Sequence, residues 1–179
     1  MSIEAKAAKI RLVLFDVDGV LTDGKVVIHA DATESKTFDI KDGIAMVWGQ
    51  RAGLTVGLLS ARQSATTPHR AAQLGITLVR QGVPNKLDAY DHILSELGLV
   101  DPQVAYMGDD IVDLAVLARV GLSSAPGDAT AEVRSRVDFV SAYAGGAGAV
   151  REVIELVLRA RGMWDSIVAA YETEGHAGK

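Results

Sequence analysis

The chain has 179 residues, a net charge of −5 at pH 7 and no cysteine. This length allows one hydrophobic core, so we expect a single domain over residues 1–179 with a loose tail over about 174–179. The missing cysteine excludes thiolate catalysis and Cys-based zinc sites, and the acidic balance argues against non-specific nucleic-acid binding. The chain starts without an apolar secretion signal and has no run of ~20 apolar residues, so we expect a cytoplasmic protein that binds neither nucleic acid nor membranes.

Short runs rich in Val, Ile and Leu alternate with amphipathic stretches along the chain. The runs expected to form strands are Ile10–Phe15, Leu54–Ser60, Ile76–Arg80, Val104–Met107, Gly121–Ser124 and Val137–Val140. The stretches expected to form helices are Gly43–Ala52, Ser64–Leu74, Lys86–Leu97, Ile111–Ala118, Ala129–Ser135, Ala149–Arg161 and Trp164–Glu172. This alternation predicts an α/β fold with a doubly wound, mostly parallel, Rossmann-like sheet.

The segment between the first strand and the first helix interrupts the alternation. Lys25–Ala30 and Ser35–Ile40 each have the pattern of a strand, and the polar residues Asp31–Glu34 between them favour a turn. We therefore expect an inserted β-hairpin at about residues 25–40. Such a hairpin has no obvious partner in a parallel sheet, so it either docks on another subunit or remains exposed to solvent.

Polar residues follow the predicted strands, at the edge of the sheet where ligands bind in this kind of fold. They are Asp16, Asp18, Ser60, Lys86, Asp109, Asp110 and Asp113. Five carboxylates in one crevice would repel one another unless a cation lies among them. Oxygen ligands and positions left open for water and phosphate suit Mg²⁺, so the pattern predicts a magnesium site.

The first two carboxylates suit the chemistry of phosphoester hydrolysis. Asp16 can act as a nucleophile and metal ligand, forming an aspartyl-phosphate that divides hydrolysis into two displacements. Asp18 can protonate the leaving group and then take a proton from water, and its backbone carbonyl is within reach of the same metal.

The other polar residues suit charge stabilisation. Ser60 and Lys86 can bind the phosphoryl oxygens. Asp109 is expected to be a further metal ligand, with Asp110 and Asp113 holding Lys86 and the surrounding loop. Taken alone, each motif also fits a turn, a helix cap or a surface charge, but four such motifs in order at strand ends favour a catalytic site.

The order DxDGV, Ser, Lys and GDDxxD resembles the four motifs of haloacid dehalogenase phosphatases. More narrowly, the chain resembles the family of 3-deoxy-D-manno-octulosonate 8-phosphate phosphatases over roughly Ile10 to Arg161. The stretches that carry this resemblance are DVDGVLTDG at 16–24, Phe38–Gly43, Gln81–Lys86, Ala105–Asp110 and Ala144–Glu152.

The resemblance implies a phosphatase acting on a sugar-acid phosphate of lipopolysaccharide biosynthesis. It implies Asp16 as nucleophile, Asp18 as acid and base, and Mg²⁺ bound by Asp16, Asp18 and Asp109. It also implies a homotetramer assembled through the inserted hairpins. Two departures concern the substrate, because the chain has Ala61 where members usually have glycine and Ala147 where they commonly have an arginine.

The spacing of the motifs leaves no room for a separate cap domain. The hairpin, the helices and the strands use up the residues between Asp18 and Lys86. Substrate selection must therefore come from loops at the crevice or from a neighbouring subunit. The residues expected to bind the substrate are Lys41, Asp42, Gly43, Ser60, Arg62, Arg70 and Lys86.

The cations in this set suit a carboxylated sugar, because guanidinium and ammonium groups pair with carboxylates. Two members have plain alternatives. Asp42 fits an N-cap of the next helix, and Arg70 fits a solvated helix position.

Two other functions are compatible with parts of the pattern. The nearest is a phosphatase for a sialic-acid-like nonulosonate 9-phosphate. A phospho-accepting receiver module also combines acidic residues, Ser or Thr and Lys, but there no acidic motif follows the lysine as GDDxxD follows Lys86 here. A non-catalytic scaffold has no support because all four motifs are present.

Overall fold

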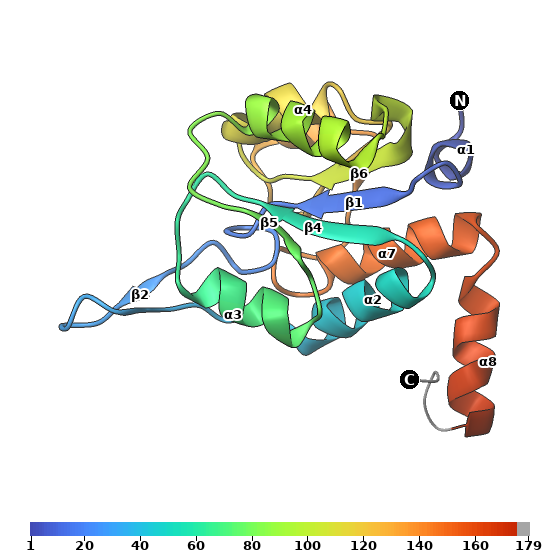
Figure 1. The fold of residues 1–179 in the computed structure, drawn as a ribbon, viewed down its shortest axis with the longest axis horizontal. Helices are drawn as coiled ribbons and strands as arrows, with labels where there is room; N and C mark the ends of the chain where they lie inside the picture. Colours follow the sequence, from blue (N-terminus) through green and yellow to red (C-terminus); the bar gives the residue numbers. More distant parts are fainter. Residues whose placement is uncertain (175–179) are drawn as a thin grey trace.

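A parallel sheet with strand order β5-β4-β1-β6-β7-β8 runs through the centre of the molecule (Figure 1). The computed structural model describes residues 1–174. Its parallel strands are β1 (Leu12–Phe15), β4 (Thr55–Leu59), β5 (Leu78–Arg80), β6 (Val104–Met107), β7 (Leu122–Ala125) and β8 (Phe139–Val140). The predicted parallel α/β sheet is confirmed, although several strands are shorter than expected.

Helices cover both faces of this sheet (Figure 1). On one face lie α2 (Ile40–Arg51), α3 (Thr66–Gln73) and α7 (Ala149–Ala160). The other face carries α4 (Lys86–Leu97), together with the short helices α5 (Leu114–Leu117) and α6 (Ala131–Arg134). The sheet is therefore doubly wound, as its sequence pattern predicts.

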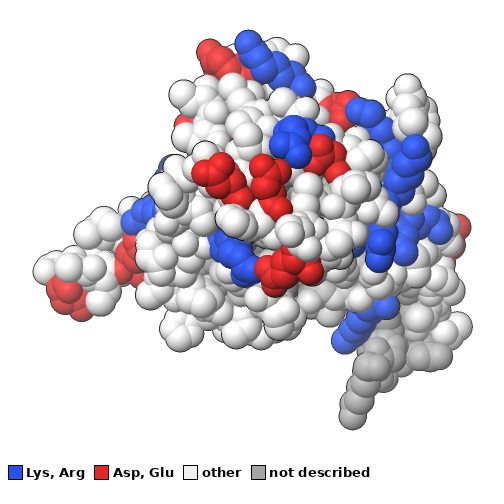
Figure 2. Space-filling model, turned by 45° about the horizontal axis from the view of Figure 1, so that its top comes forward, with Lys and Arg blue, Asp and Glu red and all other residues white. Residues whose placement is uncertain are grey.

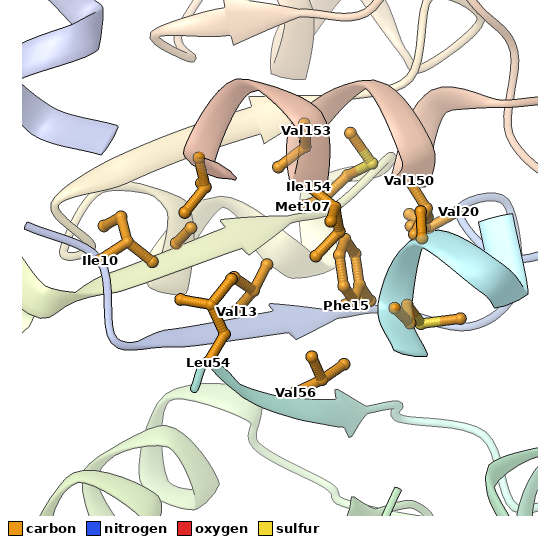
Figure 3. Packing of buried hydrophobic residues seen from close by; sticks show 14 of the residues in the cluster. Ile10, Val13, Phe15, Val20, Leu54, Val56, Met107, Val150, Val153 and Ile154 are labelled. Carbon is orange, nitrogen blue, oxygen red and sulfur yellow. The ribbon is translucent and has the colours of Figure 1, made fainter. Parts of the chain in front are cut away.

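The central strand β1 is buried on both faces because all four of its side chains are apolar. Val13 and Phe15 pack in the cluster with α7, whereas Leu12 and Leu14 point to the opposite cluster, as the two-residue period of a strand requires. Figure 3 shows Val13 and Phe15 facing the apolar side chains of α7. This packing fixes the end of β1, and Asp16 follows directly.

The helix α2 begins three residues earlier than its apolar pattern indicates. The Asp39 carboxylate accepts hydrogen bonds from the backbone N–H groups of Lys41 and Asp42 and so caps the helix. The alternative that Asp42 caps α2 is therefore wrong. Asp42 instead accepts hydrogen bonds from the backbone N–H groups of Gly148 (3.2 Å) and Arg151 (2.8 Å) at the start of α7.

The inserted hairpin consists of β2 (Val27–Ile28) and β3 (Glu34–Ser35), which pair antiparallel. It is shorter than predicted, and it projects away from the body of the molecule (Figure 1). Val27 and Ile28 are 58% and 65% exposed. Among the described residues, no other insertion separates the crevice motifs, which agrees with the absence of a cap domain.

The ends of the chain add two helices. The unexpected α1 (Ile3–Ala7) is capped by the Ser2 hydroxyl, and α8 (Trp164–Glu174) closes the described part of the chain. Residues 175–179 of the expected loose tail lie outside the described residues. None of the described helices combines the length and apolar character needed to cross a bilayer.

Charges of both signs lie next to one another in the middle of the face shown in Figure 2. Exposed ion pairs such as those of Arg119 with Asp91 and Asp101 contribute little to stability. Attraction of an anion must therefore come from cations placed close to its binding site.

Candidate active site

A crevice lies at the carboxyl ends of β1, β4 and β6, open to solvent. Its lining residues are Asp16, Asp18, Gly24, Ser60, Ala61, Arg62, Lys86, Asp109, Asp110 and Val112. The fold thus brings together polar residues from the loops after β1, β4 and β6 and from the first residue of α4, because parallel strands end at the same edge of the sheet.

Lys86 lies at the base of this crevice between two carboxylates. Its Nζ is 2.7 Å from Asp16 Oδ2 and 2.6 Å from Asp113 Oδ1. Burial lowers the pKa of the Lys86 ammonium, but the two carboxylates more than offset this, and the pKa is raised. Lys86 therefore stays charged, and α4, capped by Asn85, holds it in place.

Asp113 holds the loop after β6 rather than binding a ligand. Its Oδ1 accepts hydrogen bonds from Lys86 and from the Tyr106 hydroxyl, and its Oδ2 accepts from the backbone N–H groups of Asp109 and Asp110. With two donors on each oxygen, the carboxylate has no position left for a metal. Asp110 makes its own hydrogen bond to the backbone N–H of Ile111.

Tyr106 was missed by the sequence analysis, which treated it as part of an apolar strand. Its hydroxyl lies 3.3 Å from Lys86 Nζ and donates to Asp113, and the side chain is fully buried. The sequence does contain a signal for it, a hydroxyl inside an otherwise apolar strand and two residues before GDD, because a buried hydroxyl needs a partner.

Asp16 and Asp109 form a pair of carboxylates that fits a divalent cation. Carboxylate oxygens of Asp16, Asp109 and Asp113 lie within 4.8 Å of one another. Burial, and then the neighbouring negative charges, raise the pKa of Asp109 to about 7. Burial also raises the pKa of Asp16, to about 6, despite the opposing effect of Lys86. No hydrogen bond or ion pair to the Asp109 carboxylate occurs within residues 1–174, so its oxygens are free to bind a cation.

Gly19 leaves the space that this carboxylate pair requires. A Cβ added to Gly19 would lie 2.1 Å from Asp109 Oδ2, and the glycine has a φ of +86°. We predict that Gly19→Ala weakens Mg²⁺ binding by about tenfold or more, because the Asp109 carboxylate must move. Isothermal titration of Mg²⁺ measures this change.

Gly53→Ala is the matched control for this variant. Gly53 has a similar φ of +82° with no atom within 4 Å of the added Cβ, so both variants lose about 1 to 2 kcal/mol of stability from the backbone alone. Equal Mg²⁺ affinity in the two variants would contradict the prediction.

Asp18 and the residues after β4 line the opposite side of the crevice. The Asp18 carboxylate pairs with Lys36 of the hairpin, with 2.7 Å between Lys36 Nζ and Asp18 Oδ1. Ser60 directly follows β4 and is only 2% exposed. Arg62 is partly exposed and pairs with Glu34.

The other candidate substrate-binding residues lie outside this crevice. Lys41 lines a separate pocket of about 430 Å³ together with Tyr143 and Ala147. Asp42 is buried and caps α7, as described above. Of the polar residues expected to bind substrate, Ser60, Arg62 and Lys86 therefore reach the crevice of their own subunit.

Gly43 and Arg70 contact each other instead. A Cβ on Gly43 would lie 2.3 Å from Arg70 Nη2, so the glycine makes room for the guanidinium. Arg70 donates to the Asp39 carbonyl and lies over the Phe38 ring. Within one subunit, this arrangement joins α3 to the start of α2.

Asp16 follows the first strand of a parallel sheet, pairs with Lys86 and lies close to the Asp109 carboxylate. This arrangement is typical of α/β hydrolases that transfer phosphoryl groups. Residues 62–154 match the family model of the haloacid dehalogenase-like hydrolases. The chain belongs to this family. It is also similar to the 3-deoxy-D-manno-octulosonate 8-phosphate phosphatase of Escherichia coli K12, with 42% identity over 90% of this chain and 86% of the relative.

Solved structures agree with this assignment. A probable phosphatase of Pseudomonas syringae has a TM-score of 0.94 and 39% identity, with 99% of this chain and 98% of that chain covered. The 3-deoxy-D-manno-octulosonate 8-phosphate phosphatase of Moraxella catarrhalis has a TM-score of 0.92 and 34% identity, with 94% and 97% covered. That structure is a complex with a magnesium ion, a phosphate ion and a KDO molecule. The resemblance stated from the motifs is confirmed.

Proposed function

We propose that this protein is a magnesium-dependent phosphatase that hydrolyses 3-deoxy-D-manno-octulosonate 8-phosphate through an aspartyl-phosphate on Asp16. The observation that carries the proposal is the position of Asp16, which lies 2.7 Å from Lys86 and close to the Asp109 carboxylate, for which residues 1–174 provide no partner. The chain is similar to phosphatases of this substrate, and one of them was crystallised with magnesium, phosphate and KDO. This similarity supports the same conclusion.

Asp16 is the proposed nucleophile because its carboxylate is held at both oxygens. Oδ1 accepts from the backbone N–H of Val17 (2.6 Å) and Oδ2 faces Lys86. One oxygen attacks phosphorus while the bond to the sugar oxygen breaks. Water then attacks the aspartyl-phosphate and releases phosphate, which restores the Asp16 carboxylate.

Asp18 is the proposed acid and base for these two steps. It lies in the same crevice and can give a proton to the leaving alkoxide, then take one from the attacking water. Lys86 and Ser60 would stabilise the charge on the phosphoryl oxygens.

The residues that would hold Mg²⁺ are Asp16, Asp109 and the backbone carbonyl of Asp18. When bound, the cation neutralises negative charge on the phosphoryl group and on these carboxylates. Asp113, whose oxygens already have their donors, would support the loop that carries Asp109.

Arg62 is the proposed partner of the substrate's carboxylate, because it is the guanidinium that lines the crevice. Lys41 and Arg70 would have to act in the crevice of a neighbouring subunit.

We propose a homotetramer in which the hairpins meet, since Val27 and Ile28 expose apolar side chains there. The lack of cysteine suits the reducing cytoplasm.

A substrate panel with purified protein and Mg²⁺ tests the proposed function. It compares 3-deoxy-D-manno-octulosonate 8-phosphate with a nonulosonate 9-phosphate and with glucose 6-phosphate, which has no carboxylate. We expect kcat/KM to be about tenfold or more higher for the eight-carbon acid than for either alternative. Equal or better turnover of the nine-carbon substrate would overturn the substrate assignment.

A further inference from the structure

The return arm of the hairpin brings two charged side chains back to the crevice. Glu34 lies in β3, and Lys36 is the first residue after this strand. Between them, the Ser35 hydroxyl lies 2.8 Å from His29 Nε2 on the outgoing arm.

Lys36 is held against the carboxylate of Asp18. Its Nζ lies 2.7 Å from Asp18 Oδ1 and 2.9 Å from Oδ2, and its side chain is only 1% exposed. Lys36 does not itself line the crevice, whereas Asp18 does. The buried ammonium group contacts both oxygens of the Asp18 carboxylate, which is 22% exposed, and so restricts the direction in which that carboxylate points.

Glu34 attaches the return arm of the hairpin to the loop after β4. Its carboxylate pairs with Arg62 and accepts a hydrogen bond from the Ser64 hydroxyl. Two crevice-lining residues, Asp18 and Arg62, are thus each paired with an opposite charge from the return arm of the hairpin. This double attachment holds Lys36 in place although the tip of the hairpin projects into solvent (Figure 1).

We propose that Lys36 is a positioning residue that aims the Asp18 carboxylate at the leaving oxygen of the substrate. The inference rests on the proposed function, because it assigns Asp18 the proton transfers of that reaction. It gives the hairpin a task within its own subunit, separate from any role in assembly.

If Lys36 acts through Asp18, the effect of losing it on the rate of hydrolysis should depend on whether the leaving group of the substrate needs a proton. A sugar alkoxide needs a proton as it leaves, whereas p-nitrophenolate leaves readily without one. Loss of Lys36 should therefore slow hydrolysis of an alkyl phosphate much more than hydrolysis of p-nitrophenyl phosphate. A general loss of structure would slow both.

The test compares Lys36→Met with Lys25→Met, a matched substitution on the outgoing arm. Lys25 is exposed and pairs only loosely with Asp23, at 3.4 Å. For Lys36→Met we expect kcat on the sugar-acid phosphate to fall about 10- to 100-fold, with KM nearly unchanged and less than about threefold loss on p-nitrophenyl phosphate. Lys25→Met should match the wild type on both substrates.

A second comparison shows whether Lys36 acts through Asp18. In an Asp18→Asn background, Lys36→Met should change kcat by less than about twofold, since effects that share one route do not add. Thermal melting checks that each variant is folded. Equal losses on both kinds of substrate, or unchanged kcat in Lys36→Met, would overturn the inference.

Failure of the proposed function would look different. If the wild type hydrolyses other alkyl phosphates but not the sugar-acid phosphate, the substrate assignment fails. The comparison of alkyl and p-nitrophenyl phosphates then still decides the role of Lys36.

Discussion

Asp16→Asn is expected to abolish turnover, lowering kcat by about 10⁴-fold or more, because an amide cannot attack phosphorus as a carboxylate does. The fold should remain intact. Asn is close in shape to Asp, and Lys86 keeps its contact with Asp113 at 2.6 Å. Phosphate release under saturating substrate measures the loss, and thermal melting checks the fold.

Asp31→Asn at the tip of the hairpin is the control for this substitution. Asp31 is exposed and accepts hydrogen bonds from the backbone N–H and the hydroxyl of Thr33. Asp31→Asn removes the same negative charge as Asp16→Asn but far from the crevice, so its turnover should match that of the wild type. Activity retained in Asp16→Asn at more than a few per cent would contradict the covalent mechanism.

Removal of Mg²⁺ is expected to have the second large effect, on both activity and stability. In the metal-free protein, burial raises the pKa of Asp16 to about 6 and that of Asp109 to about 7, from ordinary values of 3.8. A carboxyl whose pKa is raised by folding stabilises the folded state while it is protonated. That contribution is present at pH 4 and lost as the pH rises through about 7.

Mg²⁺ binds the ionised carboxylates, so its effect should grow as they lose their protons. We expect chelation to abolish activity at pH 8 and to lower the melting temperature by about 5 °C or more relative to saturating Mg²⁺. At pH 5 the difference in melting temperature should be much smaller. Differential scanning fluorimetry at the two pH values measures it, and an equal or larger difference at pH 5 would contradict the cation site.

The sequence predicts the sheet and the crevice lining because both depend on local patterns and on topology. Short apolar runs such as Leu12–Phe15, alternating with amphipathic stretches, indicate buried strands, and parallel strands bring the residues that follow them to one edge. The position of Asp16 near Lys86 follows from that rule alone.

The contacts of the hairpin could not be predicted in this way. Glu34 and Lys36 reach Arg62 and Asp18 only because the return arm folds back along the crevice. No period or motif in residues 25–40 indicates that path. The inserted hairpin was expected from its turn, but its direction depends on tertiary packing.

The capping of α2 is a second feature that could not be predicted from the sequence. Asp39 and Asp42 are both reasonable caps in the sequence, and both carboxylates do cap a helix. Asp39 caps its own helix, whereas Asp42 caps α7, which lies more than a hundred residues away along the chain. Sequence proximity alone cannot distinguish the two.

The position of the phosphoryl group during turnover is the most direct test of the mechanism. Rapid quenching of the wild type with substrate and Mg²⁺, followed by borohydride reduction, converts an aspartyl-phosphate to homoserine, which peptide mass spectrometry can locate. The mechanism predicts homoserine at residue 16, and none in Asp16→Asn. Homoserine at another aspartate, or its absence during rapid turnover, would contradict the central claim that Asp16 attacks phosphorus.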